Sequence, residues 1–233
     1  MADNLAAVHR RMAAACAAAG RPPDSVRLLA VSKTHGPEAV RAAAAAGQVL
    51  FGENRVQEAA AKMPECPVHL QWHLIGHLQS NKAAQAAQLF DWVHSVDSIK
   101  LLEALDRHAA EAGRRLDVLV QVNVSGERSK SGLAPEALPA VLARGNELAN
   151  VQVRGLMTIP PLTEDPEKAR PHFRALRELR DRWAAELGMD LDELSMGMTH
   201  DLDVAVAEGA TFVRVGTGIF GARARPAEGA EEA

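Results

Sequence analysis

A lysine stands at the end of a short apolar run near the start of the chain. The run covers residues 26–33 and ends on Lys33, with Gly36-Pro37 following closely. An apolar run of this length bounded by turn residues predicts a buried strand, so Lys33 is expected where that strand leaves the core. A partly desolvated lysine loses its proton readily, and its amine can attack an aldehyde to form a Schiff base. The alternative is a lysine whose ammonium simply reaches solvent from a strand end.

Two later segments combine glycine, threonine and arginine. Residues 195–199 read Ser-Met-Gly-Met-Thr, and residues 213–221 read Val-Arg-Val-Gly-Thr-Gly-Ile-Phe-Gly. Glycines let backbone N–H groups approach an anion, and the hydroxyls of Thr199 and Thr217 can donate further hydrogen bonds. Arg214 adds a positive charge. The two segments predict a phosphate site, with tight-turn glycines and a structural arginine as the alternative.

A reactive lysine and a phosphate site together predict a ligand that carries both an aldehyde and a phosphate. Pyridoxal 5′-phosphate is the simplest candidate, because its protein partners are a Schiff-base lysine, phosphate donors and a partner for the pyridine nitrogen.

The elements that would position these residues alternate along the whole chain. Glycine, proline and capping residues separate apolar runs of strand length from stretches with helical periodicity. Eight such repeats in 233 residues predict a single-domain α/β fold, a (β/α)8 TIM barrel whose site lies at the carboxyl ends of the strands. A doubly wound open sheet is the alternative. We expect an extra N-terminal helix over residues 3–19, the barrel over about 26–221 and a loose tail over 222–233. Strands are expected at residues 26–33, 49–54, 71–76, 92–96, 116–124, 151–159, 194–199 and 211–215.

Composition narrows the class of protein. The net charge is −4 with acidic and basic residues interspersed, which argues against a nucleic-acid-binding surface. No apolar segment approaches the length of a membrane span. The N-terminal residues do not resemble a signal peptide, because they include the acidic Asp3 and lack an apolar core. A cytoplasmic protein is therefore expected. Cys16 and Cys66 are expected to be free thiols. We expect a monomer, since no amphipathic surface is left over once the barrel is assembled.

Seven short blocks also resemble the signature blocks of the pyridoxal phosphate homeostasis protein family, also called YggS/PROSC-like proteins. They run in order from about residue 26 to 222. The blocks are Ala30-Val31-Ser32-Lys33, residues 51–54 with 56–58, residues 72–76 with 78–82, residues 129–132, Gly155-Leu156-Met157, residues 195–198 and residues 213–217.

The resemblance implies a barrel of the alanine-racemase N-terminal type that binds pyridoxal 5′-phosphate through Lys33. It further implies that Arg214 faces the pyridine nitrogen. The remaining implied positions are Thr199, Gly216 and Thr217 at the phosphate, Asn54 in the ring pocket, and His73, Met157, Ser195 and Met198 as neighbours.

The implied role is storage, buffering or delivery of the cofactor, with apoenzymes that depend on it as the implied recipients, without robust turnover. An arginine beside the pyridine nitrogen disfavours protonation of that nitrogen and makes the cofactor a poorer electron sink. Three positions depart from the family pattern, which usually has serine at Thr199, often proline at His77 and often an aromatic residue at Arg55.

Other functions remain open at this point. An alanine-racemase-like enzyme would need a second base, which those racemases take from a tyrosine of a second domain; this sequence contains no tyrosine, and no second domain is expected. A class I aldolase also has a Schiff-base lysine on a barrel, but usually on a later strand.

Three further features have a functional and a structural interpretation. The spacing of His69, His73 and His77 would span about 13 Å on a strand, too far for one metal ion, so no metal site is expected and His73 should point into the barrel. Lys82 and Lys130 could contact an incoming phosphate ligand, but solvated side chains are favoured.

Overall fold

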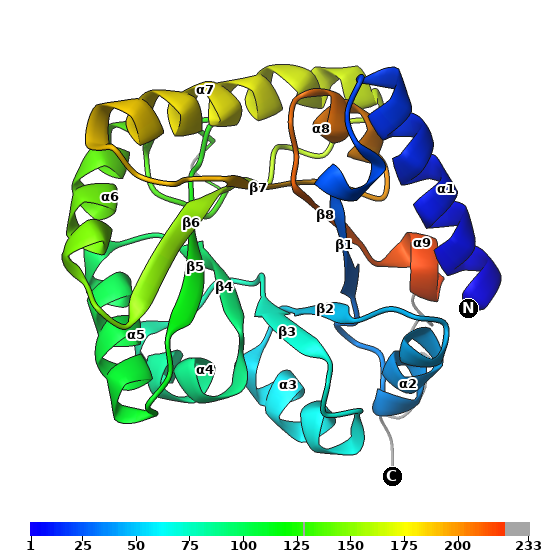
Figure 1. The fold of residues 1–233 in the computed structure, drawn as a ribbon, viewed down its shortest axis with the longest axis horizontal. Coiled ribbons are helices and arrows are strands. Elements are labelled where there is room, and N and C mark those ends of the chain that lie inside the picture. The colour runs from blue at the N-terminus through cyan, green and yellow to red at the C-terminus, as the bar shows by residue number, and fades with distance from the viewer. Residues whose placement is uncertain (128, 222–233) are drawn as a thin grey trace, which may run out of the picture.

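The protein is a closed barrel of eight parallel strands surrounded by helices (Figure 1). The computed structural model describes residues 1–127 and 129–221, so the predicted tail at 222–233 lies outside the described residues. Each strand pairs with the next, and β1 pairs with β8 to close the ring. The predicted TIM barrel is therefore confirmed, and the open sheet is wrong. The strands are β1 (Arg27–Val31), β2 (Leu50–Glu53), β3 (Gln71–Leu74), β4 (Trp92–Val96), β5 (Leu116–Gln121), β6 (Val151–Met157), β7 (Glu193–Met198) and β8 (Phe212–Val215).

The helices lie outside the strands, as the alternation along the chain predicts (Figure 1). Longer helices carry one buried face against the barrel, and short 3-10 turns (η) begin or extend several of them. They are α1 (Ala2–Ala18), η1 (Pro23–Ser25), α2 (Pro37–Ala45), α3 (Val56–Lys62), η2 (Met63–Glu65), η3 (Ser80–Lys82), α4 (Ala83–Leu89), α5 (Ile99–Glu111), η4 (Pro135–Ala137), α6 (Leu138–Glu147), η5 (Pro166–Ala169), α7 (Arg170–Leu187), α8 (Leu202–Ala207) and α9 (Thr217–Phe220).

The ends of several elements differ from prediction. The expected fifth and sixth strands run to residues 124 and 159, whereas β5 ends at Gln121 and β6 at Met157. After β5, the Asn123 side chain accepts hydrogen bonds from Ser125 and Gly126, and this local turn draws the chain away from the ladder. After β6, two consecutive prolines lack the N–H groups that would extend the sheet. The helical turn α9 was not predicted.

Alternation along β1 fixes which way its side chains point. Leu29 and Val31 share a small apolar cluster with Ile75 inside the barrel, whereas Leu28 and Ala30 belong to the large core beneath the helices. Because successive strand residues face opposite sides, the next inward position after Val31 is Lys33.

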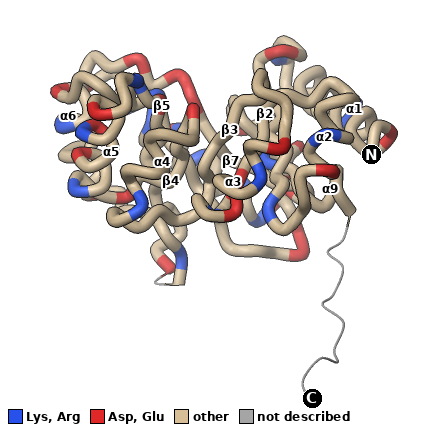
Figure 2. Tube along the Cα trace, turned by 90° about the horizontal axis from the view of Figure 1, so that it is seen from below, with Lys and Arg blue, Asp and Glu red and all other residues tan. Residues whose placement is uncertain are grey.

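Charge is spread over the outside of the molecule. Figure 2 shows Lys and Arg interspersed with Asp and Glu along the helices and loops. Among the residues that the structure describes, no helix is both long and apolar enough to cross a membrane. Both cysteines are free and buried, as predicted.

The N-terminal helix α1 supports the end of β7. Its buried face packs beside α8 and α9 (Figure 1). From the exposed side of α1, Arg11 Nη1 donates to the Thr199 carbonyl oxygen at 2.6 Å and pairs with the Asp203 carboxylate. The extra helix therefore holds one of the predicted phosphate-site residues from outside the barrel.

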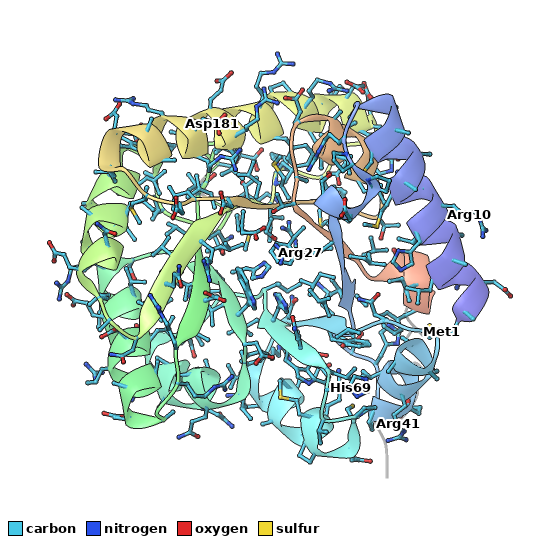
Figure 3. All side chains as sticks on the ribbon, in the orientation of Figure 1. Met1, Arg10, Arg27, Arg41, His69 and Asp181 are labelled. Atoms are coloured by element: carbon cyan, nitrogen blue, oxygen red, sulfur yellow. The ribbon has the colours of Figure 1, made fainter. Side chains whose placement is uncertain are left out.

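We expect Arg11→Met to lower the free energy of unfolding by about 1 kcal/mol, because it removes partly exposed charge-assisted hydrogen bonds. Urea denaturation of the purified proteins measures the difference. Arg10→Met is the matched control, since Arg10 is exposed and points outward at the edge of the molecule (Figure 3). Equal losses in the two variants would contradict a specific role for Arg11.

Candidate functional site

A cavity of about 520 Å³ opens at the carboxyl ends of the strands. Its size suits a small cofactor or metabolite. Among the described residues that line it there is no aspartate or glutamate, so the cavity favours an anionic ligand. The lining residues are Val31, Lys33, Asn54, Ile75, Gly76, His77, Gln121, Ser129, Lys130, Ser131, Ile159, Leu162, Met198, Thr199, His200, Arg214, Gly216 and Thr217.

The structure brings seven of the ten predicted site residues to this cavity: Lys33, Asn54, Met198, Thr199, Arg214, Gly216 and Thr217. The other three, His73, Met157 and Ser195, are not among its lining residues and are fully buried in the barrel. They can act on a ligand in the cavity only through the residues that line it.

One end of the cavity gathers hydrogen-bond donors of the kind that suit an anion. The hydroxyl of Thr217 donates to that of Thr199 at 3.4 Å, and Gly216 directly precedes helix α9. N–H groups in the first turn of a helix have no acceptor within the helix, so those beside Gly216 can turn to a ligand. Two hydroxyls and backbone donors therefore meet at this end.

A close approach of two backbones shapes another part of the cavity wall. A side chain at Gly76 would place its Cβ 2.2 Å from the carbonyl oxygen of Asn54. Glycine is required here because the two backbones nearly touch. This contact holds Asn54, which follows β2, beside the residues that follow β3.

Arg214 forms the floor of the cavity. Its side chain is 3% exposed. Nη1 donates to Ser195 Oγ at 2.7 Å, and Nη2 donates to the Thr158 carbonyl oxygen at 2.9 Å. Burial lowers the pKa of the guanidinium to about 10, so Arg214 remains charged at neutral pH. Two fixed acceptors thus hold a cation against the cavity.

A chain of hydrogen bonds runs from Arg214 through Ser195 to two buried histidines. Ser195 Oγ lies 3.0 Å from His94 Nδ1, and His94 Nε2 lies 2.8 Å from His73 Nδ1. Arg214 can only donate, so Ser195 Oγ accepts its hydrogen bond, and further hydrogen bonds join the hydroxyl to the two imidazoles. Burial holds the pKa of His94 well below its usual value and lowers that of His73 to about 3. Both imidazoles are therefore neutral, and they link Ser195 to the interior of the barrel.

Aromatic rings and a second arginine close the barrel below the histidines. The His73 ring stacks on Trp92, with 5.6 Å between ring centroids, and contacts Phe212 edge-on. Arg27 lies over the Phe212 ring and pairs with Glu193; Figure 3 shows Arg27 at the centre of the barrel. Besides its apolar side chains, the interior therefore contains two arginines, Arg27 and Arg214, and the neutral histidines.

Sequence reasoning missed His94 and Thr158, which hold the floor of the cavity. The alternation of Trp92, His94 and Val96 in a strand could have indicated that His94 faces inward with His73. No sequence signal marks Thr158, because it contributes its backbone oxygen.

The two lysines left open by the sequence occupy different places. Lys130 lines the cavity, whereas Lys82 lies in an adjoining crevice of about 310 Å³ beside Arg55. His73 points into the barrel, as predicted. Within residues 1–127 and 129–221, no group of three His, Cys, Asp or Glu side chains could hold a metal ion.

Comparison with protein families gives one match over almost the whole chain. The family described as alanine racemase, N-terminal domain, matches residues 4–224. The chain is also 49% identical to the pyridoxal phosphate homeostasis protein of Pseudomonas aeruginosa and 45% identical to that of Aquifex aeolicus. These alignments cover 96% of both chains in the first case, and 95% of this chain and 97% of the relative in the second.

Solved structures agree with this family. PipY of Synechococcus elongatus PCC7942, solved with pyridoxal 5′-phosphate bound, shares 45% identity at a TM-score of 0.83, covering 94% of this chain and 99% of PipY. The alanine racemase of Clostridium difficile shares 14% identity at a TM-score of 0.67, over 85% of this chain and 53% of the racemase. The latter likeness shows the fold alone.

Proposed function

Because this chain belongs to the pyridoxal phosphate homeostasis protein family, we propose that it binds pyridoxal 5′-phosphate in the described cavity and buffers or delivers it. One observation carries the proposal: one cavity, with no carboxylate among its described lining residues, holds a lysine, two threonine hydroxyls beside a glycine and a buried arginine. These groups match the aldehyde, the phosphate and the pyridine nitrogen of the cofactor. When bound, the cofactor supplies an electrophilic aldehyde carbon and an electron-withdrawing ring.

Lys33 is the proposed point of attachment. It follows the inward-facing Leu29 and Val31 on β1 and lines the cavity. Its neutral amine nitrogen would bond to the aldehyde carbon, with loss of the carbonyl oxygen as water. Thr199, Gly216 and Thr217 would hold the phosphate, and Asn54 and Met198 would contact the ring from the cavity wall.

Arg214 would face the pyridine nitrogen. Its charge disfavours a second positive charge on that nitrogen, which weakens the ring as an electron sink. Ser195, His94 and His73 would act from below by holding the guanidinium in place, and Met157 by packing beside them. This arrangement suits a carrier better than a racemase, and the sequence contains no tyrosine to serve as the second base of the related racemases.

The test is the visible absorbance of the protein loaded with pyridoxal 5′-phosphate, followed by borohydride reduction and peptide mapping. We expect a Schiff-base band and a reduced adduct on Lys33. Lys33→Ala should remove both, whereas Lys130→Ala, which changes the other lysine of the cavity, should keep both. Adding amino acids to the loaded protein should produce no racemisation.

A parent protein that shows no band, or whose reduced adduct maps to another residue, would overturn the assignment of Lys33. Racemisation of an added amino acid at an enzymatic rate would overturn the carrier function.

The location of the protein, its oligomeric state and the recipients of the cofactor are proposed as well. We propose a cytoplasmic monomer that passes the cofactor to enzymes that depend on it. Light scattering after size-exclusion chromatography should give the mass of one chain, and a dimer mass would contradict the monomer.

A further inference from the structure

The turn that carries Lys33 has an unusual backbone. Among the described residues other than glycine, Thr34 alone has a positive φ, at +67°. L-residues adopt this left-handed conformation at a cost of about 1 kcal/mol or more, and it persists only where the surroundings impose it. Something must therefore hold the residue next to Lys33.

Hydrogen bonds hold the turn on both sides of the lysine. Before it, the carbonyl oxygen of Ser32 accepts from Lys62 Nζ at 2.8 Å. After it, the N–H of Thr34 donates to Glu58 Oε1. Lys62 Nζ also contacts Glu58 Oε1 at 3.2 Å, so one pair of charged side chains from α3 fixes both neighbours of Lys33.

A buried carboxylate anchors this pair to the sheet. Glu53, at the end of β2, is 0% exposed, and Lys62 is 4% exposed. Glu53 Oε1 accepts from Lys62 Nζ at 2.6 Å and from Ser32 Oγ at 2.6 Å. The second oxygen, Oε2, has no hydrogen-bond partner among the described residues, and burial raises the pKa of this carboxyl group.

Such a network is not the arrangement that would maximise stability. Burying charges costs solvation that their attraction only partly returns, and an unsatisfied buried oxygen adds to that cost. A buried ion pair is better suited to fixing one conformation among several. Here the conformation that it fixes is the strained turn at Lys33.

We propose that Glu53, Lys62 and Glu58 form a positioning network that holds the Lys33 turn in its strained conformation and so sets how long pyridoxal 5′-phosphate stays attached. The proposal rests on the proposed function, in which Lys33 is the point of attachment. None of the three lines the cavity, so they act through the turn.

Glu58→Ala tests the network, because Glu58 is its least buried member, with 27% of its side chain exposed, and Lys62 keeps its partner Glu53. The loaded protein is diluted, and release of pyridoxal 5′-phosphate is followed by ultrafiltration. We expect release to be about tenfold faster, as for loss of one charge-assisted hydrogen bond. Affinity for pyridoxine 5′-phosphate, which has the ring and phosphate but no aldehyde, should be unchanged. Glu65→Ala removes an exposed carboxylate just after α3 and should change neither value.

A rescue variant separates positioning from general damage. Glycine adopts a positive φ without strain, so Thr34→Gly in the Glu58→Ala protein should bring release back to within about twofold of the parent. In the cofactor-free protein, Glu58→Ala should also speed hydrogen exchange at the Thr34 amide about tenfold or more.

Three results would overturn the positioning network. They are unchanged release in Glu58→Ala, an equal loss of affinity for pyridoxine 5′-phosphate, or failure of Thr34→Gly to restore retention. Failure of the proposed function is distinguishable, because it appears in the parent protein as an absent adduct on Lys33, whereas amide exchange at Thr34 reports the network without cofactor.

Discussion

Replacing Thr199 and Thr217 together by valine is expected to weaken binding of pyridoxal 5′-phosphate by about a hundredfold. Valine keeps the shape of threonine but removes the two hydroxyls that meet at the anion end of the cavity. A hydrogen bond to a charged group contributes about 1.5 kcal/mol or more, so losing two gives roughly this change in the dissociation constant. Equilibrium titration of the cofactor-free protein measures it.

Pyridoxal, which lacks the phosphate, provides the internal control for this pair of substitutions. Its affinity should be the same in the parent and the double variant, because in the proposed site the hydroxyls would contact only the phosphate. Thr163→Val, on the loop after β6, should leave both affinities unchanged. Equal weakening for pyridoxal and its phosphate would show that the two threonines support the fold and do not bind the phosphate.

Acid is expected to destabilise the protein through the buried histidines. The pKa of His73 is lowered to about 3 in the folded protein and is near 6.5 in an unfolded chain. Below pH 6.5 His73 therefore binds a proton in the unfolded state but not in the folded state. The free energy of unfolding falls as the pH is lowered toward 3. Between pH 7 and pH 5, proton binding by His73 in the unfolded state lowers the free energy of unfolding by about 2 kcal/mol. His94 acts in the same direction.

The measurement is urea denaturation of the cofactor-free protein at several pH values between 7 and 5. His73→Gln, which cannot take up a proton, should reduce the acid-induced loss by about 2 kcal/mol. His69→Gln is the matched control, since His69 is exposed. An unchanged pH dependence in His73→Gln would show that His73 is not a neutral buried group.

The fold could be predicted from the sequence because its signals are local and repeated. Each strand of a parallel barrel is covered on both faces and reads as an apolar run, and each helix is bounded by proline, glycine or a capping residue. Strand ends were less predictable. The apolar run continues past Gln121 to Val124, but the side chain of Asn123 turns the backbone away from the sheet.

The site was predictable where chemistry and chain position coincide. Lys33, Thr199 and Thr217 stand at strand ends, and parallel strands bring those ends together. The supporting residues could not be predicted in the same way. The contacts of His94 with Ser195, and of Lys62 with the Ser32 carbonyl oxygen, depend on packing between distant elements. A buried lysine on α3 looks the same in sequence as a solvated one.

The pairing of the first strand with the last also determines when a newly synthesised chain can complete its fold. Lys33 follows β1, whereas Thr217 follows β8, and these strands meet only when the ring closes. A chain emerging from the ribosome can form its early βα units but has no partner for β1 until nearly all residues are synthesised. Contacts so distant in sequence form slowly. Newly made protein should therefore gain the ability to capture its cofactor late and in one step, and chains truncated before β8 should not retain it.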